Sequence, residues 1–213
     1  MLFDLDGTIT DSAPGITATL AHTLEVMHRP VPTPAELVAF VGPPILDGFA
    51  ALGLTPSEGR EALAIYRERY QESGAFNSHV YPGIEQSMRA IYATGVPIAL
   101  ATSKPETQAR RILTHFGLED VFVFIGGASD DELRSEKADV VEYVLENLVR
   151  LGVDISNPIM IGDREHDVHG AAANGVPTIF VEWGYGAEAE KVGSIAVADS
   201  PADLVPLITT GLI

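Results

Sequence analysis

The stretch MLFDLDGTITDS (residues 1–12) places acidic residues directly after a short apolar run. Leu2 and Phe3 are typical of the start of a buried strand. Asp4 and Asp6 then interrupt the run where a strand should remain in the core. Because one residue separates the two aspartates, both can reach the same small volume near the end of the strand. The stretch therefore predicts either a tight turn, for which Asp-Gly is a common signal, or a functional site.

The composition is that of a globular chain with a large excess of acidic residues. Of the 213 residues, 46% are hydrophobic and 20% are charged, and the formal net charge is −17. Such a charge repels nucleic acids and anionic membranes, so we expect no nucleic-acid polymer and no membrane as partner. An anionic substrate would need a local positive site. The chain has only three lysines with which to build one, namely Lys104, Lys137 and Lys191.

The same composition bears on the cellular setting and on the available chemistry. The chain has no cysteine, which excludes disulfides and thiolate chemistry. It has no run of apolar residues long enough to span a membrane and no recognisable signal peptide. We therefore expect a cytoplasmic protein.

From residue 83 onward, apolar strand patterns alternate with helical patterns. Continuous apolar strands joined by helices predict a parallel sheet that is covered on both faces, which is an α/β fold. Right-handed crossovers place the carboxyl ends of all these strands on one edge. The expected strands after the first are residues 97–103, 121–127, 158–163, 177–182 and 194–198, with helices at 84–93, 106–116, 137–151 and 167–174 and after Pro201.

Residues 13–80 have a different pattern, with helical stretches and no clear strand. The helical stretches are 15–28, 34–40, 45–52 and 57–73, and prolines punctuate them. The simplest interpretation is a small all-helical domain at residues 13–81, inserted after the first strand into a core made of residues 1–12 and 82–213. We expect this insert to move as a unit, hinged near residues 11–13 and 79–82.

Polar residues follow the predicted strands at the edge where ligands bind in such sheets. Thr102, Ser103 and Lys104 end the second strand of the core. Asp163 ends the strand at 158–163, and Lys137 begins the helix after the third strand. Each of these motifs alone also fits an ordinary turn. Their joint occurrence at successive strand ends favours a site.

Gathering Asp4, Asp6 and Asp163 at one edge would bring three mutually repelling carboxylates together. A hard divalent cation removes that repulsion, and all-oxygen ligands suit Mg²⁺. Lysine and hydroxyl groups beside such an ion can bind a phosphate. The combination favours phosphoryl transfer with a carboxylate nucleophile and a second carboxyl group as acid and base.

Four segments resemble, in order, the motifs of the haloacid dehalogenase superfamily of phosphohydrolases: FDLDGTITDS (3–12), ALATSKP (99–105), Lys137 and IGDREHD (161–167). The resemblance implies a Rossmann-like core with a mobile helical C1-type cap that closes over the site. It implies Asp4 as the nucleophile that forms an aspartyl-phosphate, and Asp6 as general acid and then general base.

The resemblance also implies how the site binds its ligands. Magnesium would be held by the Asp4 carboxylate, the Asp6 main-chain carbonyl and Asp163. The phosphoryl group would be bound by Thr102 and Lys137 and by the backbone N–H of Ser103. Asp167 would act on the metal from behind these ligands, through a bound water.

Within the superfamily, the residues favour hydrolysis of a phosphate monoester. Dehalogenases lack the second aspartate of the first motif, which is present here as Asp6. The related sugar-phosphate mutases carry a histidine where this chain has Ile16, and phosphonate hydrolysis needs a lysine that residues 13–80 lack. A phosphomutase and a non-catalytic phosphate-binding module are kept as remote alternatives. The expected partner is a small phosphorylated metabolite, and the expected state is a monomer or a weak homodimer.

The substrate is less sharply defined. GGASDDELRSEKADVV (126–141), IGDREHDVHGA (161–171) and WGYG (183–186) resemble a subgroup described as 5′-nucleotidases, whereas this cap type by itself implies phosphoglycolate. We therefore expect nucleoside 5′-monophosphates or other small organic phosphates, with phosphoglycolate as the alternative. The turn FVGPP (40–44) either faces the substrate or ends a helix. Aromatic residues of the insert that could contact a base are Phe40, Phe49, Tyr66 and Phe76. The carboxylate of phosphoglycolate would need a cation instead, and three of the insert's arginines, Arg60, Arg67 and Arg69, fit surface ion pairs with nearby glutamates.

Five residues near the motifs have more ordinary interpretations. His166 and His169 are expected at the surface or beside the site rather than as ligands. Arg134 could orient the nearby motif lysine, touch substrate or be exposed. Trp183 and Tyr185 fit a packing role better than a place in the site wall.

Overall fold

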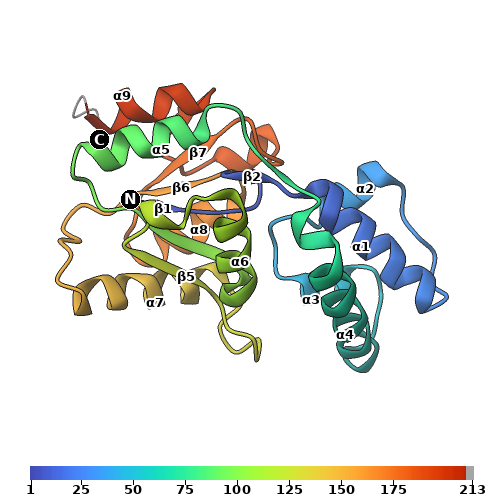
Figure 1. Ribbon diagram of the computed structural model, residues 1–213. Coiled ribbons are helices and arrows are strands. Elements are labelled where there is room, and N and C mark those ends of the chain that lie inside the picture. Colours follow the sequence, from blue (N-terminus) through green and yellow to red (C-terminus); the bar gives the residue numbers. More distant parts are fainter. Residues whose placement is uncertain (210–213) are drawn as a thin grey trace.

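The computed structural model describes residues 1–209 and has a parallel six-stranded sheet at its centre (Figure 1). The strand order is β5-β4-β1-β6-β7-β8, and every neighbouring pair is parallel. The α/β fold expected from the sequence is confirmed. The strands are β1 (Leu2–Phe3), β4 (Ala99–Pro105), β5 (Phe124–Ala128), β6 (Met160–Gly162), β7 (Thr178–Val181) and β8 (Ala196–Ala198).

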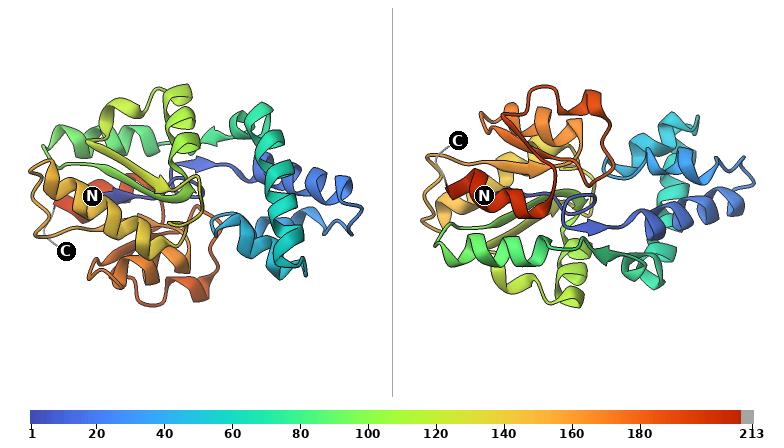
Figure 2. Two further views of the ribbon diagram at one scale, coloured as in Figure 1. Left: turned by 90° about the horizontal axis from the view of Figure 1, so that it is seen from below. Right: turned by 90° about the horizontal axis from the view of Figure 1, so that it is seen from above.

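Helices cover both faces of this sheet, as the two views of Figure 2 show. Helices α7 (Lys137–Arg150) and α8 (Glu165–Ala172) pack on one face. Helices α5 (Ile84–Ala93) and α6 (Glu106–Phe116) lie on the other, and α9 (Leu204–Thr209) packs against α5. Among the described residues, no helix is long and apolar enough to cross a membrane.

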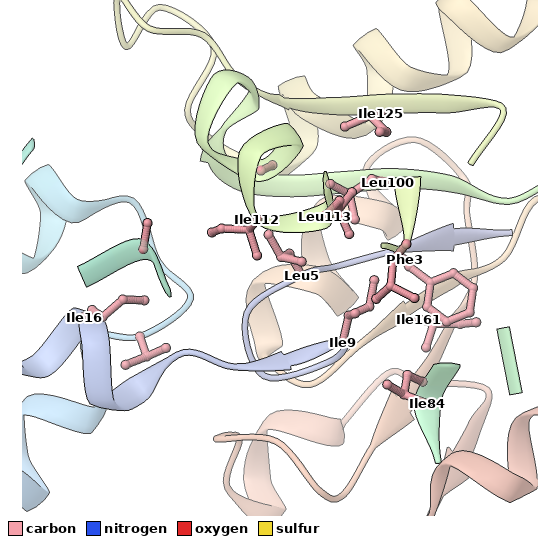
Figure 3. Close-up of a cluster of buried hydrophobic side chains, with 14 of the residues drawn as sticks. Phe3, Leu5, Ile9, Ile16, Ile84, Leu100, Ile112, Leu113, Ile125 and Ile161 are labelled. Atoms are coloured by element: carbon pink, nitrogen blue, oxygen red, sulfur yellow. The ribbon is translucent and has the colours of Figure 1, made fainter. Parts of the chain in front are cut away.

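The short strand β1 shows how the sequence builds both layers of the core. Successive side chains of a strand point to opposite faces. Leu2 belongs to the buried cluster beneath α7, with Val140 and Val144. Phe3 belongs to the cluster on the opposite face, and Figure 3 shows it beside Leu100 and Ile161. The strand is thus buried on both faces, and the polar residues that follow it lie at its carboxyl end.

The apolar run at residues 121–127 is only partly a strand, which corrects the expected boundary. Residues Glu119–Val121 form a 3₁₀ turn, in which the Phe122 N–H donates to the carbonyl of Glu119. Val121 is buried in the core within this turn. The chain therefore joins the sheet only at Phe124, and the apolar character of the run reflects burial rather than strand pairing alone.

Residues 13–76 form the helical insert, which lies beyond the carboxyl edge of the sheet (Figure 1). Two of its helices begin with Pro at an early position and a reciprocal capping box, Thr33 with Glu36 and Thr55 with Glu58. Such caps satisfy backbone N–H groups that a helix start leaves free. The helices are α1 (Ala13–Val26), α2 (Pro34–Val38), α3 (Ile45–Ala51) and α4 (Pro56–Glu72), followed by the 3₁₀ turn η1 (Gly74–Phe76). The domain limits 13–81, and motion as a unit, stay predictions.

The two chain segments that enter and leave the insert lie side by side. Strand β2 (Thr10–Asp11) pairs antiparallel with β3 (His79–Val80), a short strand that the sequence did not predict. The Tyr185 hydroxyl donates to Asp11 Oδ1 at 2.7 Å and accepts from the Ser12 N–H at 2.7 Å. Tyr185 therefore fastens the entry segment to the core, which is more specific than the packing role expected for it.

Replacing Tyr185 by Phe should loosen this junction. The change removes the acceptor of the Ser12 N–H, so we expect hydrogen exchange at that amide to accelerate by about tenfold, the effect of losing one typical hydrogen bond. Exchange measured by NMR or mass spectrometry checks this. The control Tyr92→Phe alters an exposed tyrosine of α5 and should leave Ser12 unchanged. Equal protection of Ser12 in wild type and Tyr185→Phe would contradict the bridging role.

Candidate active site

Three buried carboxylates meet at the carboxyl edge of the sheet. Asp4 follows β1, Asp163 follows β6, and Asp167 lies in the first turn of α8. Oxygen atoms of all three lie within 4.8 Å of one another. The sequence correctly brought Asp4 and Asp163 together. Asp167, for which we predict a role behind the metal ligands, lies in the same cluster, and that role stays a prediction.

Lys137 lies within the carboxylate cluster and bridges two of its members. Its Nζ is 2.6 Å from Asp4 Oδ1 and 2.7 Å from Asp167 Oδ1, and it also donates to the Ala101 carbonyl at 3.1 Å. Burial alone would lower the pKa of Lys137, but the two carboxylates raise it above its ordinary value. The lysine is thus a fixed positive charge at the first turn of α7.

Burial makes the ionised form of the carboxylates less favourable than it is in water. Burial raises the pKa of Asp4 to about 6, although Lys137 acts in the opposite direction. Burial also raises the pKa of Asp163 well above its ordinary value, with further contributions from Asp167 and Asp4. Because one lysine faces three carboxylates, it does not balance their formal negative charge. The set of hard oxygen donors, left short of positive charge, fits a divalent cation such as Mg²⁺.

Asp163 is held by groups from two distant segments. Its Oδ1 accepts from the Thr8 hydroxyl at 3.2 Å, and its Oδ2 accepts from the Tyr185 N–H at 2.7 Å. Two glycines make room for it. A Cβ added at Gly7, where φ is +91°, would lie 2.2 Å from Asp163 Oδ2, and one at Gly184 would lie 2.4 Å from the same atom. The glycines of FDLDG and WGYG are thus required by the site.

Asp167 is fixed through both of its oxygens. While Oδ1 faces Lys137, Oδ2 accepts from the Arg164 N–H at 3.0 Å. This arrangement limits the freedom of the side chain. Its predicted action through a metal-bound water stays a prediction. His166 and His169 lie on α8 outside the carboxylate cluster.

Asp6 has a different set of partners from Asp4. Its Oδ2 lies 2.8 Å from Lys104 Nζ, and Lys104 also donates to the Tyr70 hydroxyl of the insert at 3.0 Å. Its Oδ1 is buried and has no hydrogen-bond partner within the described residues. Burial opposes the charge on Lys104, but Asp6 raises the pKa of this lysine. The sequence brought Lys104 to this edge without giving it a role, and it gave no sign of Tyr70.

The second motif lies next to these groups. Thr102 and Ser103 are buried at the end of β4, and Thr102 Oγ1 accepts from the Lys104 N–H at 3.3 Å. Ser103 Oγ is buried without a partner among the residues described. Both residues are therefore near the cluster as expected, and their binding of a phosphoryl group stays a prediction.

A cavity of about 290 Å³ lies between the insert and the core. Asp6, Ser103 and Lys104 line its core side. The FVGPP loop (40–44) contributes Phe40 and residues 42–44 to the wall of this cavity. That the loop faces a substrate stays a prediction. Other apolar and aromatic residues of the wall are Ile16, Ile45, Leu63, Tyr66 and Tyr70.

Of the four aromatic residues that we considered able to contact a base, two line the cavity and two do not. Phe40 and Tyr66 line the cavity, and the Tyr66 ring stacks on Tyr70 with centroids 5.5 Å apart. Phe49 is fully buried against Tyr66 and is a core residue. Phe76 lies instead against His115 of α6, outside the cavity.

Two arginines correct the sequence-based expectations. Arg67 was expected in a surface ion pair within its own helix, but it lines the cavity and pairs with Glu132 of the core. The expectation failed because the partner lies far away in sequence. Arg134 stacks on the Tyr143 ring at 3.6 Å and donates to the Gly127 carbonyl at 3.1 Å. It is thus a packing residue rather than a free one.

With this site and fold, the chain belongs to the haloacid dehalogenase-like hydrolase family, whose family model matches residues 1–181. A crystal structure of a predicted phosphatase from Clostridium acetobutylicum superposes with a TM-score of 0.92 at 37% identity, covering 98% of this chain and 97% of that one.

Curated relatives carry different names. The tyrosine-protein kinase PtkA of Mycobacterium tuberculosis is 44% identical over 186 residues, which are 87% of this chain and 62% of PtkA. A 5′-nucleotidase of Pseudomonas aeruginosa is 37% identical over 191 residues, which are 89% of this chain and 85% of that protein. Relatives at 30% to 33% identity are named phosphoglycolate phosphatase. This chain thus spans less than two thirds of the length of PtkA.

Replacing Lys137 by Met should destabilise the protein when no divalent cation is present. The change leaves buried carboxylates without their positive partner, so the free energy of unfolding should fall by roughly 3 kcal/mol, as for other broken buried ion pairs. Urea unfolding in the presence of a chelator measures this. Lys191→Met, which breaks exposed ion pairs with Glu182 and Glu188, is the control and should have far less effect. Equal losses in the two variants would contradict a central role for Lys137.

Proposed function

We propose that this protein is a magnesium-dependent phosphate monoester hydrolase that acts through an aspartyl-phosphate on Asp4. The observation that carries the proposal is the buried cluster at the sheet edge. In it, the Lys137 ammonium group contacts Asp4 at 2.6 Å, and the carboxylates of Asp163 and Asp167 lie beside them. A buried carboxylate held against a cation suits attack on a phosphoryl group, and Asp6, two residues after Asp4, lines the cavity between insert and core.

In the first half of the reaction, a carboxylate oxygen of Asp4 attacks the phosphorus and forms an acyl phosphate. The bond from phosphorus to the leaving oxygen breaks, and that oxygen takes a proton from the Asp6 carboxyl group. Lys104 holds Asp6 Oδ2, while Oδ1 is buried without another partner among the described residues. This oxygen is therefore free to exchange a proton with the leaving group.

In the second half, a water molecule attacks the phosphorus through its oxygen atom, and Asp6 accepts a proton from this water. The bond between Asp4 and phosphorus then breaks, which restores the Asp4 carboxylate and releases inorganic phosphate. The general acid of the first half is the general base of the second, as microscopic reversibility requires.

The phosphoryl group would be held by Lys137, by the Thr102 hydroxyl and by the Ser103 N–H. Magnesium would be held by the carboxylates of Asp4 and Asp163 and by the main-chain carbonyl of Asp6, and when bound it would stabilise negative charge on the phosphoryl oxygens. Thr8 and Tyr185 would orient Asp163 from behind.

The cavity favours a leaving group with an apolar face. Its volume of about 290 Å³ is close to the lower end of the usual range for small-molecule sites, roughly 300–1,000 Å³. The wall offers Phe40 and the stacked pair Tyr66 and Tyr70. These features support nucleoside 5′-monophosphates or other small organic phosphates as substrates, with phosphoglycolate as the alternative. A cytoplasmic location, and a monomer or weak homodimer, stay predictions from the sequence.

The relation to PtkA makes transfer to a tyrosine hydroxyl a second candidate. The same nucleophile could in principle pass its phosphoryl group to a hydroxyl instead of to water. The enclosed space between insert and core, about 290 Å³, supports a small acceptor over a protein segment. Incubation with ATP followed by detection of phosphotyrosine would distinguish the two, and we expect phosphate release to dominate.

The wild-type protein should release phosphate from p-nitrophenyl phosphate with Mg²⁺ and should lose this activity on chelation. Asp4→Asn should abolish turnover, because the amide is not a nucleophile. Asp6→Asn should lower kcat by about 10²–10⁴, the usual contribution of proton transfer. Asp139→Asn, on the exposed side of α7, is the matched control and should be fully active. Substantial release by folded Asp4→Asn would contradict the proposal, and release of no phosphate by the wild type would favour the non-catalytic or mutase alternative.

Parallel measurements of kcat/KM should favour nucleoside 5′-monophosphates over phosphoglycolate. The physical reason is that a base gains contact with the aromatic wall, whereas a carboxylate finds cations that are already paired. A preference of about a hundredfold for phosphoglycolate, close to 2.7 kcal/mol, would reverse this ordering.

A further inference from the structure

The cavity has two cationic side chains among its described lining residues, and each already forms an ion pair. Lys104 contacts Asp6 and the Tyr70 hydroxyl on the core side. Arg67 reaches from α4 of the insert and forms an ion pair with Glu132. Its NH2 group also donates to the Asp130 carbonyl at 3.0 Å. A substrate entering this space therefore meets no unpaired cation away from the phosphoryl site.

Glu132 lies in a loop, residues 129–134, that is held by hydrogen bonds between its own backbone groups. The Glu132 N–H donates to the Ser129 carbonyl at 3.1 Å, and the Ser129 N–H donates to the Arg134 carbonyl at 2.8 Å. Glu132 adopts a left-handed backbone conformation with φ of 63°, which is uncommon for a residue other than glycine. Its side chain is only 18% exposed and that of Arg67 33%, so water screens the pair incompletely.

We propose that Glu132 sets the charge selectivity of this cavity by holding Arg67 in a closed ion pair, so that uncharged leaving groups are accepted and anionic ones are rejected. The inference rests on the proposed phosphatase function and names a specificity-determining residue for it. A carboxylate brought beside Arg67 must either displace Glu132 or lie next to it. Either course is unfavourable, because it breaks a partly buried pair or places like charges together.

An uncharged, hydroxyl-bearing leaving group faces no such cost. The carboxylates of Glu132 and Asp130 line the same cavity and can accept hydrogen bonds from hydroxyl or amino groups. The aromatic side chains that line the same cavity, Phe40, Tyr66 and Tyr70, can pack against the apolar part of such a group. The charges and the shape of the cavity thus select for the same chemical class.

The ion pair also joins the insert to the core, so a purely structural role has to be distinguished. Arg67 and Glu132 are separated by 65 residues and belong to the two parts that enclose the cavity. If the pair only held the two parts together, its loss would change turnover of all substrates by a similar factor. A selectivity role instead changes the ratio between substrates that differ in charge.

The test compares two substrates of similar size, phosphoglycolate and 2-hydroxyethyl phosphate, by their kcat/KM values. Glu132→Gln keeps the shape of the side chain but frees the charge of Arg67. We expect it to raise the ratio of phosphoglycolate to 2-hydroxyethyl phosphate by about tenfold or more. Arg67→Gln should lower this ratio, because Glu132 is then an unpaired anion. The double variant, with both Glu132→Gln and Arg67→Gln, should not show the raised ratio of phosphoglycolate to 2-hydroxyethyl phosphate. Glu85→Gln, which breaks an ion pair with Arg89 on the outer surface, should leave the ratio unchanged.

The outcomes separate the inference from the function on which it rests. An active enzyme whose ratio stays within about twofold of wild type in both Glu132→Gln and Arg67→Gln would overturn the inference alone. A gain that persists in the double variant would also overturn it, since the effect would not pass through Arg67. A wild-type protein that releases no phosphate from these two substrates, from p-nitrophenyl phosphate or from a nucleoside 5′-monophosphate would overturn the proposed function and the inference together.

Discussion

The ammonium group of Lys137 lies between two buried carboxylates, and the active edge of the sheet depends on this contact. Asp4 and Asp167 are far apart in the sequence, yet both approach Lys137 Nζ within 2.7 Å. Without a cation, buried carboxylates whose oxygens lie within 4.8 Å of one another would strongly oppose folding. The lysine lets the protein fold with its carboxylates gathered, but its one positive charge does not balance the three carboxylates of Asp4, Asp163 and Asp167. That remaining imbalance is what makes the cluster suited to a divalent cation.

Asp163 connects this edge to the junction with the helical insert. The Tyr185 N–H donates to Asp163, and the hydroxyl of the same tyrosine binds Asp11 and the Ser12 N–H at the start of the insert. One residue thus contacts both the carboxylate cluster and the segment about which the insert would move. A change in the position of Asp163 would be felt at the junction, because few rotatable bonds separate the two contacts. The close fit at Gly7 limits how far Asp163 can shift.

The groups that the sequence predicted and those that it missed differ in what positions them. The meeting of Asp4, Lys137 and Asp163 follows from parallel topology, which brings successive strand ends to one edge whatever the loops do. The contact of Lys104 with Tyr70 and that of Arg67 with Glu132 depend on how the insert packs on the core. Helical periodicity reports which face of α4 is buried but not which loop lies opposite. A residue such as Arg67, flanked by glutamates in its own helix, therefore gave a misleading local signal.

The core and the insert position different groups, which offers a chemical reason why relatives with the same fold are named for different activities. In the proposed function the core would supply the groups that bind the phosphoryl group, whereas Phe40, Tyr66 and Arg67 of the insert line the cavity that would receive the remainder of the substrate. Substitutions in the insert can alter that space without touching Asp4 or Lys137. Family membership therefore constrains the reaction centre closely and the leaving group only weakly. Under the proposed selectivity, the charged groups that meet across the cavity, Arg67 and Glu132, would decide which phosphorylated compounds bind there.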